Sequence, residues 1–327
     1  MKFGFPIPNC REGRDNLTGF VGPQQIIQLS QRCEELGFDS VWANDFINPS
    51  KSSLEKFSPP PSWYEILTTL SAVAVKTETI KLGVGLIVMP FREPVILAKQ
   101  AITLDHFSNG RLLLGLGLGG IREEFTSIKP KEAKAHRGNM LDEGLESVTK
   151  LLTETGVSFE GEYYAYEDIS LYPRPVQNPI PIYISGHSKT TPQRIAKHAH
   201  GWLVSYPSLE SFKEFSKEVE ESMIAEGRSM SELDITTTWG MRLGKSRKEA
   251  LDKFKNSMQG GKPRDENWYF DNNLIGTPEE VAEFIISFEK AGANHCSPIH
   301  IAADTMPEIE EQLQILAEEV MPIVQRA

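Results

Sequence analysis

The chain has 327 residues, of which 39% are hydrophobic and 24% are charged, a balance typical of a globular protein that buries a large core. Its 34 basic and 45 acidic residues give a net charge of −11, which argues against a surface for nucleic acid or anionic membrane. The three cysteines, Cys10, Cys33 and Cys296, are scattered, so we expect a reducing cytoplasm and no disulfide framework. Because the apolar runs are short, we expect neither a signal peptide nor a membrane span.

Short β-rich runs alternate with amphipathic helices along the whole chain. Helix starts are marked by Pro23, by Pro94 and by the capping box that begins at Thr277. This alternation favours parallel strands joined by right-handed crossovers, and eight strands are the number that closes a (β/α)8 barrel. We therefore predict a single TIM-type barrel domain over residues 1–327, with an open doubly wound sheet as the alternative. The predicted strands are residues 2–7, 38–43, 80–88, 111–118, 180–185, 201–205, 234–243 and 294–301.

Two long segments interrupt the alternation. Residues 45–62 are rich in proline and serine and follow the second predicted strand, whereas residues 255–275 lie between the seventh and the eighth. In a barrel of this type the loops after the strands build the active site. We therefore expect both segments to be loop insertions, and we place the candidate site at the carboxyl ends of the strands.

A glycine-rich run from Gly115 to Gly120 ends the fourth predicted strand and contains the pattern G-x-G-x-x-G. A dinucleotide-binding fingerprint would need a helix to open at once, whereas here we expect a loop that contains Pro130. We interpret the run as a strand with a bare end, so that a flat ligand approaches the backbone near Gly117. The alternative is that the glycines serve only the packing of the barrel.

The segment from Ser185 to Thr190 follows the fifth predicted strand and precedes a helix that begins near Thr191. A glycine, small hydroxyls and a helix N-terminus are how backbone N–H groups are presented to a phosphate. Lys189 or Arg137 could add a counter-charge. The alternative is an ordinary turn whose hydroxyl groups cap the helix.

The sequence gives little support for a metal site or for a catalytic nucleophile. The histidine pairs His198/His200 and His295/His300 have no cysteine or carboxylate partners at ligand spacing, so we expect no metal site. The sequence shows no G-x-S-x-G elbow and no Cys/His nucleophile pattern.

Several of these segments together resemble the bacterial luciferase-like flavin monooxygenase superfamily, which includes FMN- and F420-dependent branches. The resemblance covers nearly the whole chain in order, and the segment before the glycine strand is its most specific part. The matching segments are ELGFDSVW (35–42), IKLG (80–83), LDHFSNGR (104–111), PIYISGHS (181–188) and GTPEEV (276–281).

The resemblance implies a TIM-type barrel with a flavin across the carboxyl ends of its strands. In such proteins the third strand often carries a non-prolyl cis peptide bond against the flavin ring, and by alignment this bond falls between Gly85 and Leu86. Both residues are therefore expected to bind the cofactor, as is Gly117. The expected phosphate-binding residues are Arg137, Gly186, His187 and Ser188.

The sequence also departs from the family pattern at several places, among them His200, where relatives usually have aspartate before Gly201 and Trp202. Phe46 follows Asp45 where relatives often have histidine. Gly120 lies where relatives that oxidise sugar phosphates with F420 place a glutamate. Gly117 and Leu118 align with a cysteine and an arginine of luciferase itself. These departures argue against light emission and against the sugar-phosphate reaction.

The resemblance implies a flavin-dependent monooxygenase that uses O2 and reduced FMN, supplied by a separate flavin reductase, on a small organic substrate through a flavin C(4a)-peroxide. Such a protein must hold the ring and exclude water. Asn44 and Asp45 are the catalytic candidates, because they are polar and follow the second strand. The alternatives are hydride transfer with coenzyme F420 in the same barrel and a non-catalytic flavin-binding protein. Relatives commonly dimerise, and we expect a homodimer.

Overall fold

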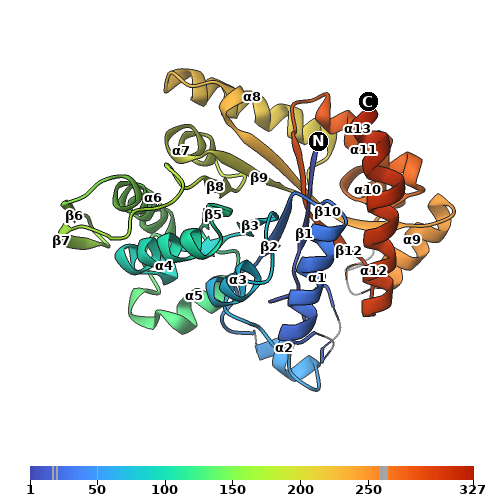
Figure 1. Ribbon diagram of the computed structural model, residues 1–327, viewed down its shortest axis with the longest axis horizontal. Helices are drawn as coiled ribbons and strands as arrows, with labels where there is room; N and C mark the ends of the chain where they lie inside the picture. The colour runs from blue at the N-terminus through green and yellow to red at the C-terminus, as the bar shows by residue number, and fades with distance from the viewer. Residues whose placement is uncertain (17, 20, 50, 258, 260–263) are drawn as a thin grey trace.

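The computed structural model describes residues 1–16, 18–19, 21–49, 51–257, 259 and 264–327. Eight parallel strands form a closed ring in which the last strand pairs with the first (Figure 1). The barrel prediction is therefore confirmed, and the open sheet is wrong. In spatial order the strands are β1 (Lys2–Pro6), β2 (Ser40–Ala43), β3 (Lys81–Val84), β5 (Leu112–Gly117), β8 (Ile182–Ser185), β9 (Gly201–Ser205), β10 (Asp234–Leu243) and β12 (His295–Ile301).

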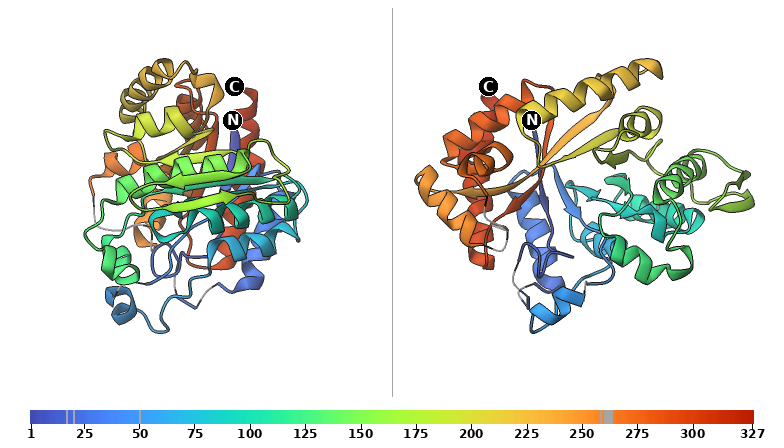
Figure 2. Two further views of the ribbon diagram at one scale, coloured as in Figure 1. Left: turned by 90° about the vertical axis from the view of Figure 1, so that its left-hand side faces the viewer. Right: turned by 180° about the vertical axis from the view of Figure 1, so that it is seen from behind.

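Helices surround the barrel, and the three predicted helix starts are confirmed (Figures 1 and 2). Pro23 and Pro94 are the first residues of their helices, and the Thr277 hydroxyl accepts a hydrogen bond from the backbone N–H of Glu280. The longer helices are α1 (Pro23–Glu35), α3 (Ile66–Ala74), α4 (Pro94–Phe107), α6 (Arg137–Thr153), α7 (Thr191–His198), α8 (Leu209–Ala225), α9 (Arg247–Asn256), α11 (Pro278–Glu289) and α12 (Met306–Ile315). A π-helical turn (Leu316–Val320) joins α12 to α13 (Met321–Arg326).

Six elements of the structure were not predicted from the sequence. A short helix, α5 (Arg122–Ile128), follows the glycine strand where we expected a loop. An antiparallel hairpin of β6 (Val157–Glu160) and β7 (Ala165–Ile169) lies outside the barrel (Figure 1). The insertion at 45–62 contains α2 (Lys51–Lys56), and that at 255–275 contains α10 (Glu266–Asn272) and β11 (Leu274–Gly276). Residues 50, 258 and 260–263 of these insertions lie outside the described residues.

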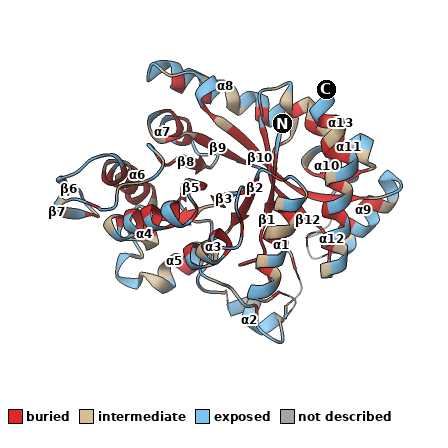
Figure 3. Cartoon of the chain, viewed as in Figure 1, coloured by how far each residue is buried: buried red, intermediate tan, exposed pale blue. Residues whose placement is uncertain are grey.

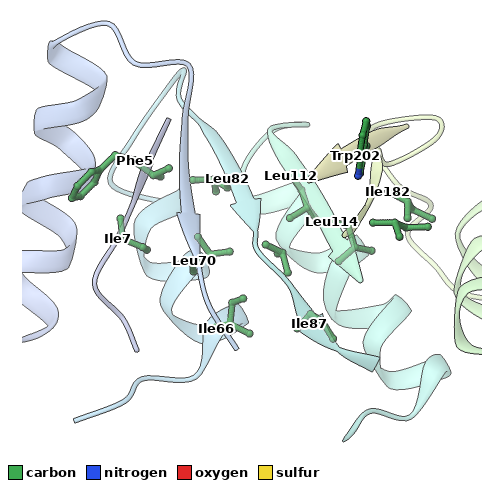
Figure 4. Packing of buried hydrophobic residues seen from close by; sticks show 14 of the residues in the cluster. Phe5, Ile7, Ile66, Leu70, Leu82, Ile87, Leu112, Leu114, Ile182 and Trp202 are labelled. Atoms are coloured by element: carbon green, nitrogen blue, oxygen red, sulfur yellow. The ribbon is translucent and has the colours of Figure 1, made fainter. Parts of the chain in front are cut away.

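The main hydrophobic core lies between the barrel and its helices. Leu82, Leu112 and Ile182 on the strands belong to the same cluster as Ile66 and Leu70 on α3 (Figure 4). The strands are buried, whereas the outer faces of the helices are exposed (Figure 3). Burying one such side chain stabilises the fold by about 1.5–3 kcal/mol. A second, smaller cluster consists of Trp42, Leu113, Tyr183 and Leu203, with Leu86 packed against it.

Polar side chains near the amino ends of the strands form a connected network. The Asp234 carboxylate accepts hydrogen bonds from the Tyr183 hydroxyl at 2.6 Å and from Lys2 at 3.3 Å, and it lies 3.2 Å from His295 Nδ1. His295 Nε2 is 3.0 Å from the Ser40 hydroxyl. Ser40, His295 and Asp234 thus follow the order of a hydrolytic triad, but Ser40 is fully buried, and a substrate has no access to it. The network links β2, β8, β10 and β12 near the amino end of the barrel.

None of the helices in the described ranges is long and apolar enough to cross a membrane. Within the same ranges, no group of three or more histidine, cysteine or acidic side chains is arranged to hold a metal ion.

We predict that Asp234→Asn lowers the free energy of unfolding by about 1–3 kcal/mol at pH 7, because Tyr183 and His295 lose a charged partner. Burial raises the pKa of the Asp234 carboxyl, but the hydrogen bonds from His295 and Tyr183 outweigh it and hold that pKa well below its usual range. The stabilisation is therefore fully present above about pH 4 and decreases as the pH falls further. Urea titrations of both proteins between pH 3 and pH 7 measure the difference.

The control is Asp252→Asn on the exposed side of α9, which should change the free energy of unfolding little at any pH. An Asp234→Asn effect that grows as the pH falls would contradict the prediction.

Candidate functional site

The peptide bond between Gly85 and Leu86 is cis, as the resemblance implied, and it separates β3 from β4 (Ile87–Val88). The Gly85 N–H donates to the carbonyl of Ala43 at 2.8 Å, and the Gly85 carbonyl accepts from Asn44 Nδ2 at 2.6 Å. The segment Gly85–Leu86 forms a bulge between β3 and β4. The two hydrogen bonds attach this bulge to the carboxyl end of β2. Its backbone is therefore fixed where the resemblance implies a flavin ring.

Asn44 is held in place by its neighbour Asn9. The Asn44 N–H donates to Asn9 Oδ1 at 2.9 Å, and Asn9 Nδ2 donates to the Asn44 carbonyl at 2.8 Å. The side-chain oxygen of Asn44 is buried and has no hydrogen-bond partner. An unsatisfied buried acceptor costs about 1–3 kcal/mol, so this oxygen is suited to accept an N–H group from a ligand.

Asp45 lies directly beside the bulge, but both of its carboxylate oxygens are engaged. One accepts the backbone N–H of Val88 at 2.9 Å, and the other accepts Arg92 Nη2 at 2.7 Å. The side chain is only 1% exposed, and this burial raises the pKa of the carboxyl to about 6 against the opposing effects of Arg92 and the Val88 N–H. Through these contacts Asp45 holds β4 and the bulge in position.

The glycines of β5 are required by the bulge itself. A methyl group at Gly115 would lie 2.0 Å from the carbonyl oxygen of Val84, and one at Gly117 would lie 2.8 Å from the Leu86 side chain. The packing alternative therefore explains these two glycines. The same close approach leaves the end of β5 bare beside Leu86, which is also what a flat ligand needs.

The segment after β8 has the form expected of a phosphate site. Gly186 has a φ of 131°, a conformation that favours glycine, and α7 begins five residues later at Thr191. The Ser188 hydroxyl lies 2.9 Å from the Thr191 hydroxyl, and His187 and Ser188 are exposed. The backbone N–H groups at the start of α7 and an exposed hydroxyl suit an anion.

Arg137 is the first residue of α6, and Arg194 on α7 donates to the carbonyl of Gly138 at 3.3 Å. The amino-terminal turns of α6 and α7 are therefore neighbours. Arg137 itself donates to the Gly119 carbonyl at 3.1 Å, and its guanidinium lies 5.7 Å from the centre of the Phe125 ring. The predicted phosphate residues thus come from adjacent helix starts, with Arg137 as their cation.

A second group of side chains at the same end of the barrel was not predicted. Arg11 and Arg14 follow β1, Tyr206 follows β9, and His300 lies near the end of β12. Their positions next to predicted strand ends were the one signal in the sequence that could have identified them. His300 entered the sequence analysis only as a residue with no ligand partners.

A planar ring with an N–H edge and a phosphate-bearing tail fits the residues on β2, β3, β5 and β8. The unpaired Asn44 oxygen suits the ring edge, and the Ser188 loop suits the tail. Flavins and deazaflavins both have this form. Asn44, Gly85, Leu86 and Gly117 would hold the ring, and the predicted phosphate residues would hold the tail.

The chain was compared with known proteins. A family model described as luciferase-like monooxygenase matches residues 1–274. An F420-dependent glucose-6-phosphate dehydrogenase of Amycolatopsis mediterranei is 28% identical over 235 residues, which are 71% of this chain and 68% of that protein. An FMNH2-dependent dimethylsulfone monooxygenase of Pseudomonas putida is 23% identical over 292 residues, 80% of this chain and 78% of that protein. The crystal structure of monooxygenase RslO1 from Streptomyces bottropensis matches with a TM-score of 0.81 and 23% identity over the full length of both chains, which shows the shared fold.

We predict that one carboxyl group of the protein titrates with a midpoint near pH 6 and that Asp45→Asn removes this titration. The physical reason is that the carboxylate is buried, so that burial favours the neutral acid. Carbon-13 NMR of the aspartate carboxyl groups between pH 4 and pH 8 measures the midpoint. Asp252→Asn should leave it unchanged, and a midpoint near pH 4 for Asp45 would contradict the prediction.

Proposed function

We propose, because this chain belongs to the luciferase-like monooxygenase family, that it is an oxidoreductase that transfers hydride between a small organic substrate and coenzyme F420. The observation that carries the proposal is the cradle formed by the Gly85–Leu86 bulge, the unpaired Asn44 oxygen and the Ser188 loop. F420 is favoured over FMN because the relative from Amycolatopsis mediterranei is named as F420-dependent. From the sequence we expected a monooxygenase that uses reduced FMN, with F420 as the alternative.

The cofactor supplies the hydride chemistry, and the protein binds and orients it. Asn44 fixes the bulge through Gly85 and offers a hydrogen-bond acceptor to the ring. Asp45 and Arg92 hold β4 in place behind the bulge. Phe46, whose ring centre is 5.4 Å from that of Trp63, helps to exclude water.

The substrate we propose is not a sugar phosphate. Phe46 and Gly120 stand where F420-dependent relatives that oxidise sugar phosphates have histidine and glutamate. Neither residue can accept or donate the proton that oxidation of an alcohol requires. The chain therefore shares the cradle with those relatives but not their proton-transfer groups.

A second candidate function is oxygenation with reduced FMN and O2. It is supported by the relative from Pseudomonas putida, which is named as FMNH2-dependent. The apolar Phe46 beside the cradle suits this reaction, because water must be excluded. A separate flavin reductase and a homodimer belong to this candidate as further proposals, and a non-catalytic flavin-binding protein is the third possibility.

The deciding experiment is an anaerobic titration of the purified protein with reduced F420 and, separately, with reduced FMN, followed by a pulse of O2. Preference for F420 and slow, substrate-independent oxygen consumption would support hydride transfer. Preference for FMN with rapid oxygen consumption would overturn it in favour of the monooxygenase. Failure to bind either cofactor would overturn both candidates.

We predict that Arg137→Met weakens binding of the preferred cofactor about ten-fold or more, because a charge-assisted contact to phosphate contributes about 1.5–3 kcal/mol. Equilibrium dialysis or fluorescence titration measures the affinity. Arg32→Met on α1 removes an exposed guanidinium paired with Glu35 and should leave the affinity unchanged. Equal affinities of the wild-type protein and Arg137→Met would remove Arg137 from the proposed phosphate site.

A further inference from the structure

The carboxyl ends of β1, β2, β9 and β12 carry a cluster of cationic and aromatic side chains, which lies on the remaining arc of the barrel and meets the cradle at β2. The arc is continuous, because β9, β10, β12, β1 and β2 are successive neighbours in the ring. We define this mouth cluster by the residues Arg11, Arg14, Asp15, Phe46, Tyr206 and His300.

One half of the mouth cluster is a rigid, charge-balanced support. Arg11 Nη1 donates to the Asp15 carboxylate at 2.5 Å, and Arg11 Nη2 lies 3.2 Å from His300 Nε2. The Arg11 side chain is only 9% exposed, and its Nε is buried without a hydrogen-bond partner. Burial, together with the Arg11 charge, lowers the pKa of His300 to about 3, so that this imidazole is neutral. Asp15 therefore balances Arg11, and no negative charge is left over.

The other half has a cation, Arg14, that interacts with the Asp15 carboxylate only at a distance and forms no direct ion pair within the described residues. The Arg14 guanidinium lies 4.3 Å from the centre of the Phe46 ring, and Arg14 is exposed. Its guanidinium forms no hydrogen bond or ion pair with any residue in the described ranges, and only its backbone N–H is bonded, to the Arg11 carbonyl at 3.1 Å. Stacking uses only the face of a guanidinium and leaves its in-plane N–H donors free for the two oxygens of a bound anion.

Tyr206 adds a free hydroxyl group near this cation, with which the phenol interacts electrostatically. Its ring stacks on His300 with centres 6.1 Å apart, and its N–H donates to the Thr238 carbonyl at 2.8 Å. The φ of Tyr206 is 49°, which is a conformation that non-glycine residues adopt rarely and often at functional sites. The side chain is 41% exposed, and its hydroxyl forms no hydrogen bond with the residues that the structure describes.

We propose that Arg14 and Tyr206 bind an oxyanion group of the substrate, a carboxylate or a sulfonate, while Phe46 and Trp63 contact its apolar part. Arg11, Asp15 and His300 position the Tyr206 ring and do not touch the anion. The inference rests on the proposed function, because it assumes that the ligand bound by the mouth cluster is the substrate and that this substrate faces the cofactor. It selects small organic anions over neutral compounds of the same shape.

The test uses benzoate and benzenesulfonate as probes and benzamide as the neutral probe of matched shape. Isothermal titration of the wild-type protein should show at least a ten-fold preference for benzoate over benzamide, and this preference should decrease at high salt. Arg14→Met keeps a long side chain over Phe46 but removes the charge, and it should abolish the preference. Tyr206→Phe removes only the hydroxyl and should reduce benzoate affinity about three-fold or more.

Arg247→Met is the matched control, because the Arg247 guanidinium on α9 also stacks on a ring, at 3.8 Å from the centre of Phe270. It should keep the full preference for benzoate. Thermal unfolding of each variant verifies that it is folded. If Arg14→Met does not fold, the benzoate affinity of Tyr206→Phe alone tests the proposal. An absent preference in the wild-type protein, or an equal loss in Arg247→Met, would overturn the proposal.

The same titrations with and without F420 or FMN separate the two proposals. A preference for benzoate without binding of either cofactor would overturn the proposed function and leave the anion site standing. Cofactor binding without any preference for anions would overturn the anion site alone.

Discussion

The hydrogen bond of 2.6 Å between the Asn44 side chain and the Gly85 carbonyl is the contact on which the geometry of the site depends. It attaches the bulge after β3 to the end of β2, and Asp45 attaches β4 to Arg92 from the next position along the chain. The bulge then lies against β5, where no side chain larger than hydrogen fits at Gly115. One polar contact and one steric requirement therefore determine where the ring-binding backbone lies.

The barrel mouth is divided into two arcs with different chemistry. The arc of β3, β5 and β8 supplies backbone, glycines and a hydroxyl-rich loop, which suit a cofactor with a flat ring and a phosphate tail. The other arc, which begins at β2, supplies guanidinium groups, a phenol and aromatic rings, which suit a small organic anion. Since the chain carries a net charge of −11, a local cation such as Arg14 is also the feature that would attract an anion to this end of the barrel.

The architecture could be predicted because it follows from local patterns. Apolar runs bounded by glycine and proline located all eight barrel strands, and the count alone indicated closure. The β6–β7 hairpin was missed because its strands are short and mostly exposed, and β6 alternates apolar and polar residues over only four positions, Val157 to Glu160. Helix α5 was missed because seven residues after a glycine run are too short for a helical period to be recognised.

Residues of the candidate site could be predicted only where one strand end or the family resemblance pointed to them. Asn44 and Asp45 were found in this way, but the sequence could not show that Asp45 is fully engaged, because its partner Arg92 is 47 residues away. Arg14 follows β1 and Tyr206 follows β9, and the two residues are neighbours only because β10 and β12 close the ring between those strands. A local sequence pattern cannot show this closure.

Polar side chains lie at both ends of the barrel, but those at the amino ends of the strands form a buried network and those at the carboxyl ends do not. Ser40, His295 and Asp234 satisfy one another inside the wall, and Ser40 is fully buried, so their order does not make them a site. At the carboxyl ends the opposite holds, because the Asn44 oxygen, the Arg14 guanidinium and the Tyr206 hydroxyl have no hydrogen-bond partners within the described chain. Polar groups that converge from separate strands without a partner in the protein are the physical reason to assign binding to this end, and the buried Asn44 oxygen among them also carries the cost of staying unpaired.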